Sequence, residues 1–229
     1  LVKMSSKLDE IPAMGQLFEK VPSVGFGLSL PHHNIPQICL DNHAAGQLAV
    51  SSLLEMGHKR IAFLNLEPSH RMLIARSHGY MEIMKEHGLF KPEYLYEYES
   101  KKREYPIEPD ESIPDCADAV KYLKSLKETP TAVVMANDWS ALGFAKACRE
   151  ADIKIPEEIS LVSIDDIGSL CKISSPSLSA VAMPFAELTE YAGNMLIDSI
   201  ESPGIYFAKH PSAQYLPGKF IERESTKRI

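Results

Sequence analysis

Short, unbroken apolar runs alternate along this chain with longer stretches in which apolar residues recur every three or four positions. The run TAVVMA at 131–136 is of the first kind, and Ala45, Ala49 and Leu53 illustrate the second. An unbroken run fits a strand buried on both faces, whereas the longer spacing indicates a helix with one apolar face. We predict strands at 1–4, 22–26, 37–40, 60–66, 131–136 and 159–164. We predict helices at 8–19, 43–56, 70–87, 114–127, 138–148 and 185–200.

This alternation predicts an α/β fold with parallel sheets, in which ligands bind at the carboxyl ends of strands. The residues that follow the predicted strands are therefore the candidates for chemistry. Polar groups gather at five such places, which are 25–34, 41–42, 67–76, 137–138 and 165–166. A charged, proline-containing stretch at 94–114 is interpreted as a long surface loop around a short strand.

The composition is typical of a soluble globular protein and excludes a disordered or fibrous chain. Of 229 residues, 45% are hydrophobic and 24% are charged, and the formal net charge is −7. No apolar run approaches the roughly 18 residues of a membrane span, and no secretory signal peptide is visible. The four cysteines form no CxxC pair, which indicates reduced thiols. We therefore expect a cytoplasmic protein that makes no membrane contact.

Motifs of the common enzyme and metal-binding classes are absent. The chain has no GxxxxGK[ST] phosphate loop, no GxSxG elbow and no HExxH or other close cluster with metal-ligand spacing. Asp138, Asp165 and Asp166 are the carboxylates that an enzyme would use, but nothing nearby pairs a nucleophile with a base. His58 follows a predicted helix end, where we expect it to satisfy carbonyl groups as a structural residue. We expect no cofactor, no metal and no enzymatic activity.

A set of short strings occurs in a fixed order along the chain. It comprises DNHAAG at 41–46, LLEMGHKRIA at 53–62, ARSHGY at 75–80, PTAVVMAND at 130–138, PEEISLVSIDD at 156–166, SPSLSAV at 175–181 and FIEREST at 220–226. Each string alone is weakly specific. The ordered set closely resembles the effector-binding core of the lactose-repressor/galactose-repressor (LacI/GalR) family of transcription regulators, over essentially the whole chain.

The resemblance implies two Rossmann-like lobes with parallel sheets, as in periplasmic binding proteins, joined by three crossovers of the chain. The N-terminal lobe would hold residues 1–41 and 184–216, and the C-terminal lobe 42–183 and 217–229. The family places two strand–helix units before the strand at 1–4, and these are absent here, as are the DNA-binding headpiece and hinge. We therefore expect an incomplete N-terminal lobe and a chain that is a fragment or is shown without its beginning.

Two residues match the family's effector contacts most directly. Arg76 follows the strand at 60–66, and its guanidinium offers donors that suit sugar hydroxyls, a carboxylate or a purine edge. Asp165 ends the strand at 159–164, and its carboxylate can accept hydrogen bonds from two neighbouring hydroxyls. A surface ion pair with Glu82 or with an acidic residue of a loop is the alternative for Arg76, and capping of the following turn is the alternative for Asp165. We expect the two side chains to face each other across the bound molecule.

Four further residues complete the candidate effector site. Asn137 is expected to reach the effector while Asp138 caps the next helix, and turn chemistry alone is the alternative for Asn137. Trp139 either stacks on a sugar or packs on its own lobe. The resemblance places Asp41 at the first crossover, as an effector contact or a hinge, and Phe26 at a loop that lines the pocket from the other lobe.

The resemblance implies a sensor that binds a small polar effector, most often a sugar, between its lobes and so controls operator binding allosterically. A homodimer would bind operator DNA through a headpiece that this chain lacks. The net charge of −7 fits a core that leaves phosphate neutralisation to such a headpiece. The alternative is a periplasmic sugar-binding protein of a transport system, which shares the fold and the cleft.

Overall fold

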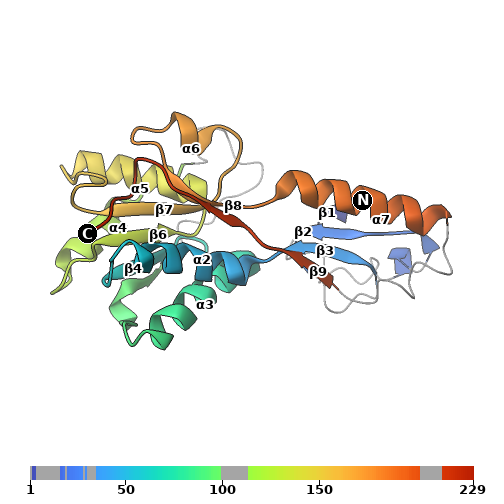
Figure 1. Ribbon diagram of the computed structural model, residues 1–229, viewed down its shortest axis with the longest axis horizontal. Coiled ribbons are helices and arrows are strands. Elements are labelled where there is room, and N and C mark those ends of the chain that lie inside the picture. The colour runs from blue at the N-terminus through green and yellow to red at the C-terminus, as the bar shows by residue number, and fades with distance from the viewer. Residues whose placement is uncertain are drawn as a thin grey trace. The chain divides into compact units, whose positions relative to one another are not determined.

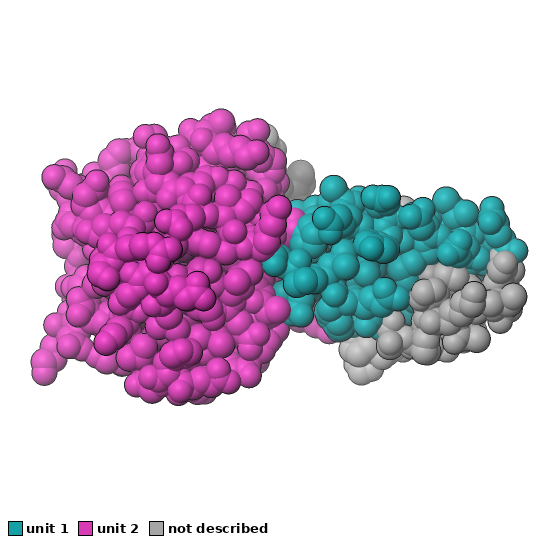
Figure 2. Space-filling model, viewed as in Figure 1, with its two compact units in different colours: residues 1–41, 184–218 teal, residues 42–183, 219–229 magenta. Residues whose placement is uncertain are grey.

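The chain divides into two compact units, each built from two stretches of sequence (Figures 1 and 2). The computed structural model describes residues 2–3, 16–18, 20–27, 29, 35–98, 113–201 and 213–229. Unit 1 holds Leu1–Asp41 and Pro184–Gly218, and unit 2 holds Asn42–Met183 and Lys219–Ile229. The third passage of the chain follows residue 218, whereas the sequence placed it after 216. The predicted helix at 8–19 and loop at 94–114 lie largely outside the described residues.

Unit 2 is built around a six-stranded sheet of order β10-β8-β7-β6-β4-β5. All neighbouring strands are parallel except β10 and β8, which confirms the predicted α/β class. The strands are β4 (Ile61–Asn65), β5 (Leu95–Glu97), β6 (Ala132–Met135), β7 (Ser160–Asp165), β8 (Ser179–Ala182) and β10 (Lys219–Ile221). The sequence analysis did not identify β8 and β10 because SAVA and KFI are too short to stand out as strand patterns.

Helices cover both faces of this sheet (Figure 1). On one face, α2 (Asn42–Glu55) contacts β6, β7 and β8, and α3 (Arg71–Glu86) contacts β4. On the other face, α4 (Ala117–Ser125) and α5 (Asp138–Glu150) enclose the main core. A 3-10 turn, η2 (Pro92–Tyr94), and the short helix α6 (Leu170–Ile173) complete the unit.

Strand β4 shows why an unbroken apolar run is needed here. Ala62 and Leu64 belong to the core that α4 and α5 cover. Phe63 points to the opposite face, where its ring centroid lies 5.4 Å from that of Tyr80 on α3. The hydroxyl of Tyr80 donates to the carbonyl of Ile61 at 3.0 Å. Because both faces are covered, all five residues of β4 are buried.

The C-terminal residues of the chain bind back into unit 2 at the amino-terminal edge of its sheet. The backbone N–H of Leu161 donates to Ser225 at 2.7 Å, and the Ser225 hydroxyl donates to the carbonyl of Leu161 at 2.6 Å. His58 is fully buried, with Nδ1 3.0 Å from the Thr131 hydroxyl and Nε2 3.0 Å from the Lys227 carbonyl. His58 is structural, but its partners come from distant parts of the chain rather than from the preceding helix.

Unit 1 contains a smaller, fully parallel sheet of order β1-β2-β3-β9. Its strands are β1 (Val2–Lys3), β2 (Gly25–Gly27), β3 (Gln37–Leu40) and β9 (Ala213–Leu216). Helix α7 (Phe185–Glu201) packs against β2 and β3 and buries Leu188, Ala192 and Met195. Its 3.6-residue apolar pattern predicted this helix from the sequence.

Candidate functional site

Arg76, in the second turn of α3, is almost completely buried inside unit 2. Its Nε donates to Oδ1 of Asn42 at 2.9 Å, and Nη1 donates to the carbonyl of Ala136 at 2.6 Å. Nη2 donates to Oδ1 of Asp165 at 2.5 Å. Every nitrogen of the guanidinium therefore has a partner, and its rigid fork of donors is held in one orientation.

The alternative surface partner predicted for Arg76 is wrong. The carboxylate of Glu82 lies 2.9 Å from Nε2 of His43, at a half-exposed position, and takes no part in the site. Arg76 instead shares the inward side of α3 with Tyr80, four residues further on, which is fully buried. Arg76 is therefore buried because it lies on the face of α3 that packs against the rest of unit 2.

Asp165, the last residue of β7, presents its carboxylate to Arg76. Its side chain is 12% exposed against 2% for Arg76, so it is the more accessible member of the pair. The φ angles of Asp165 and Asp166 are 132° and 56°, a region that non-glycine residues rarely adopt. Burial raises the pKa of the Asp165 carboxyl, and the adjacent Arg76 guanidinium acts in the opposite direction.

Arg76 and Asp165 meet directly, so the expectation that they face each other across a bound molecule was wrong. The guanidinium passes the end of β6 at Ala136 and reaches the next strand. Asn42, the first residue of α2, is 6% exposed and accepts from Arg76. The sequence analysis placed it among the polar residues that follow a strand, at 41–42, but assigned it no role.

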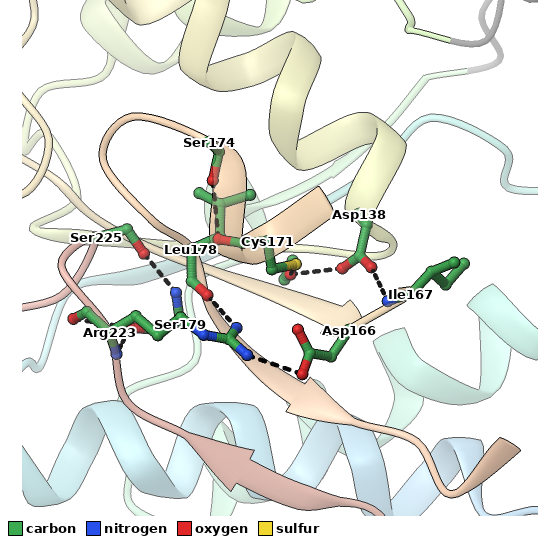
Figure 3. Close-up of polar contacts among 10 residues, drawn as sticks. Asp138, Asp166, Ile167, Cys171, Ser174, Leu178, Ser179, Arg223 and Ser225 are labelled. Atoms are coloured by element: carbon green, nitrogen blue, oxygen red, sulfur yellow. Dashed lines mark hydrogen bonds and ion pairs between the residues drawn. The ribbon is translucent and has the colours of Figure 1, made fainter. Parts of the chain in front are cut away.

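Asn137, not Asp138 as predicted, caps helix α5. Oδ1 of Asn137 accepts from the backbone N–H of Ser140 at 2.8 Å. Asp138 is fully buried, and its two oxygens accept from the Ser163 hydroxyl and the Ile167 N–H, each at 2.7 Å (Figure 3). The cap bond shows the turn chemistry that was the alternative for Asn137, and an effector contact of this residue stays a prediction.

Arg223 contacts the turn at Asp165 and Asp166 from its other side (Figure 3). Its Nη2 donates to Oδ2 of Asp166 at 2.9 Å, and its Nη1 donates to the carbonyl of Leu178 at 2.6 Å. Arg223 belongs to the string FIEREST, and no role was predicted for it. The carboxylate of Asp166 is therefore paired with this arginine.

The buried polar side-chain atoms without a partner, within the described residues, all lie at the carboxyl edge of the unit 2 sheet. They are Oδ1 of Asp166, Nδ2 of Asn65 and Nδ1 of His70. Asn65 ends β4, and His70 directly precedes α3. Burial also lowers the pKa of His70. Unsatisfied buried polar groups are costly, and they are uncommon in folded proteins.

The other predicted contacts lie in different places. Trp139 is the second residue of α5 and is half-buried. Phe26 and Asp41 belong to unit 1. Phe26 lies within strand β2, paired with Ile38, rather than in a loop. The N–H of Asp41 donates to the carbonyl of Leu216 at 2.9 Å. Effector contacts of Trp139, Phe26 and Asp41 stay predictions.

Other kinds of site have little support in the part of the chain that the structure describes. No group of three or more His, Cys, Asp or Glu residues there is arranged to hold a metal ion. A cavity of about 450 Å³ between α4 and α5 opens at the amino-terminal edge of the sheet, where Leu123, Phe144 and Ile159 line it. Its lining does not include Arg76, Asp138 or Asp165.

No helix among the described residues is long and apolar enough to cross a membrane.

Comparison with known proteins identifies relatives among bacterial regulators. The ribose operon repressor of Escherichia coli is 30% identical over 189 residues, which are 82% of this chain and 54% of the repressor. The NTD biosynthesis operon regulator NtdR of Bacillus subtilis is 27% identical over 197 residues, 85% of this chain and 56% of NtdR. The chain thus spans about half the length of these relatives.

Solved structures show the same fold. A LacI family transcriptional regulator from Enterococcus faecium with bound ribose superimposes with a TM-score of 0.80 at 22% identity, over 99% of this chain and 79% of that one. The model of the periplasmic binding protein-like domain family matches residues 50–226. The chain therefore belongs to the periplasmic binding protein-like domain family, and it is similar to the effector-binding core of LacI/GalR regulators.

Proposed function

We propose that this chain is the effector-sensing core of a LacI-type transcription regulator and that it binds a small neutral polyol, most simply a sugar, at Asp165. The observation that carries the proposal is the Arg76–Asp165 pair, at 2.5 Å, on the edge of the sheet where ligands of parallel sheets bind. A carboxylate held in one direction before the ligand arrives reduces the ordering cost of binding. Two adjacent hydroxyls of a sugar can donate to such a group.

Asp165 and Arg76 have different parts in this proposal. The guanidinium carries five N–H bonds, and three of its hydrogen bonds go to protein atoms. With 2% of the Arg76 side chain exposed, the arginine mainly orients the carboxylate. Asp165, at 12%, is the group that a sugar reaches first. A direct contact between Arg76 and the effector stays a prediction.

The charges at this edge favour a neutral effector over an anionic one. The residues described at this edge include three carboxyl groups, on Asp138, Asp165 and Asp166. They include two guanidinium groups, on Arg76 and Arg223. An anionic ligand at Asp165 would be repelled at short range in a partly desolvated site. Sugar hydroxyls supply donors without adding charge.

The names of the relatives support a regulatory role. Both the ribose operon repressor and NtdR are operon regulators, and the Enterococcus faecium protein was solved with ribose. On this proposal, the whole protein acts in the cytoplasm as a homodimer and reads operator DNA through a separate headpiece. Effector binding then shifts the population of the DNA-binding form, and no covalent step is needed.

A periplasmic sugar-binding protein is the second candidate, because it would use the same fold. The regulator relatives favour the first reading. Sequencing the gene upstream of Leu1 discriminates between them. A helix-turn-helix coding segment is the expected result, and an export signal with a small-residue cleavage site would refute the regulator.

Isothermal titration calorimetry tests the ligand class. The full chain is titrated with D-ribose, D-glucose, D-galactose and, as the anionic comparison, D-ribose 5-phosphate. We expect at least one neutral sugar to bind, and Asp165→Asn to weaken it by tenfold or more. Asp118→Asn is the matched control, because Asp118 is an exposed carboxylate on α4. Binding of the phosphate alone would contradict a neutral effector, and binding of nothing would contradict a sugar sensor.

A further inference from the structure

The turn that carries Asp165 is conformationally strained. Asp165 and Asp166 are consecutive non-glycine residues with positive φ angles, 132° and 56°. Such backbones persist only where the surrounding structure holds them in place. The direction of the Asp165 carboxylate therefore depends on whatever holds this turn.

Asp138 bonds to both sides of the turn. Oδ1 accepts from the hydroxyl of Ser163, two residues before Asp165, and Oδ2 accepts from the N–H of Ile167, directly after Asp166 (Figure 3). Both distances are 2.7 Å, within the range of well-formed hydrogen bonds. One side chain thus spans the strained residues.

The turn is also held from the side of β8 and β10. Arg223 joins Asp166 to the carbonyl of Leu178, so its fork connects the turn to the segment before β8 (Figure 3). The backbone N–H of Met183 donates to the carbonyl of Asp165 at 3.0 Å. Asp138 and Arg223 therefore hold the turn from opposite sides.

Neither helix capping nor direct ligand contact explains Asp138. Asn137 already caps α5, and Asp138 is fully buried, so no ligand reaches it. Burying a carboxyl group is costly unless hydrogen bonds or an ion pair satisfy it. The hydrogen bonds that Asp138 accepts from Ser163 and Ile167 both go to the segment that carries Asp165.

We propose that Asp138 and Arg223 are positioning residues of the effector site, which hold the Asp165–Asp166 turn so that the Asp165 carboxylate is presented to the effector. This inference rests on the proposed function, in which Asp165 is the effector's acceptor. In this inference Asp138 acts through its two hydrogen bonds to the turn and not through its negative charge.

The test compares Asp138→Asn with Asp138→Ala by calorimetry of the full chain against D-ribose, D-glucose and D-galactose. The asparagine oxygen can accept from Ile167 while its amide nitrogen donates to the Ser163 hydroxyl, so both bonds survive without the charge. We expect the affinity of Asp138→Asn for the sugar to stay within threefold of the parent chain's. We expect Asp138→Ala to bind the sugar at least tenfold more weakly. Arg223→Met, which removes the hold on Asp166, should also lose tenfold or more.

Rescue by the isosteric variant is the readout that a merely structural role would not produce. Equal affinity in Asp138→Ala and the parent chain would overturn the proposal, and so would an asparagine variant as weak as the alanine one. Ser163→Ala removes one of the two bonds with little change in volume. It should weaken binding by threefold or more even if Asp138→Ala fails to fold.

Failure of this inference is distinguishable from failure of the proposed function. Loss of binding in Asp165→Asn together with full binding in Asp138→Ala and Ser163→Ala removes only the positioning role. A parent chain that binds none of the three sugars removes the sugar-sensing function and the positioning role with it.

Discussion

The carbonyl oxygen of Arg76 occupies the space that a side chain on Gly46 would need. A Cβ at Gly46 would lie 2.0 Å from that oxygen, and a Cβ at Gly79 would lie 2.2 Å from the carbonyl oxygen of His43. Both obstacles are backbone atoms, so rotating a side chain relieves neither. These glycines allow α2 and α3 to approach closely. The helix spacing in turn fixes the backbone position from which the Arg76 side chain extends to Asp165.

Gly46→Ala should therefore destabilise the protein and disturb the site together. We expect a loss of about 1–3 kcal/mol in the free energy of unfolding, as for other overpacked positions, and weaker sugar binding, both measured on the same preparation. Gly193→Ala is the control, because nothing lies within 4 Å of a Cβ there on α7. It should gain about 0.5–1 kcal/mol. Equal unfolding midpoints for the two variants would show that α2 and α3 can separate freely.

Arg76→Met should cost far more stability than a surface arginine or lysine would. It leaves the buried Asp165 carboxyl without its partner, a change worth about 3–5 kcal/mol, measured by urea unfolding. The control is Lys146→Met, whose pair with Glu150 spans 3.9 Å and is more than 60% exposed on both sides. Lys146→Met should lower the free energy of unfolding by about 0–0.5 kcal/mol. A small loss for Arg76→Met would mean that water reaches Asp165 more freely than its burial indicates.

Stability should fall as the pH drops below neutrality, with His58 as one cause. Burial lowers the pKa of His58 from its usual value of 6.5, against the opposing effect of its bond to the Lys227 carbonyl. From about pH 7 down to the folded-state pKa, the unfolded chain binds the proton and the folded chain does not. The contribution of His58 to stability is therefore full at neutral pH and declines over that window.

His58→Gln should flatten this dependence when unfolding midpoints are compared from pH 7.5 to 5. His70, whose pKa is also lowered by burial, leaves a residual slope of the same sign. A His58→Gln variant with the same pH dependence as the parent chain would contradict the assignment.

Trp139 should report sugar binding by its fluorescence. It is the only tryptophan of the chain and lies beside Asn137 and Asp138, at the edge that carries Asp165. We expect an emission change that saturates with the same dissociation constant as calorimetry gives for the sugar. Trp139→Phe should abolish the signal, and its calorimetric affinity decides between stacking on the sugar and packing on the unit. Unchanged emission at saturation would place the sugar away from α5.

The strands of unit 2 illustrate where local pattern suffices. β4, β6 and β7 were predicted because a strand buried on both faces is mostly apolar, and a short run such as AVVM, rich in β-branched residues, is typical of such a strand. The caps were harder. Asn137 and Asp138 are adjacent and both able to cap, and the choice depends on Ser163 and Ile167, which lie 25 and 29 positions away from Asp138.

Periodicity and the ordered strings sufficed to predict the α/β class and to single out Arg76 and Asp165, because burial imposes a local repeat and short motifs are visible without a fold. The connections among these residues were decided only by folding. The partners of Arg76 lie 34, 60 and 89 positions away along the chain, and no local pattern encodes a contact at that separation. Parallel sheets bring such residues together because each strand end returns to the same edge, so the pairing emerges from packing of α2, α3 and the strands.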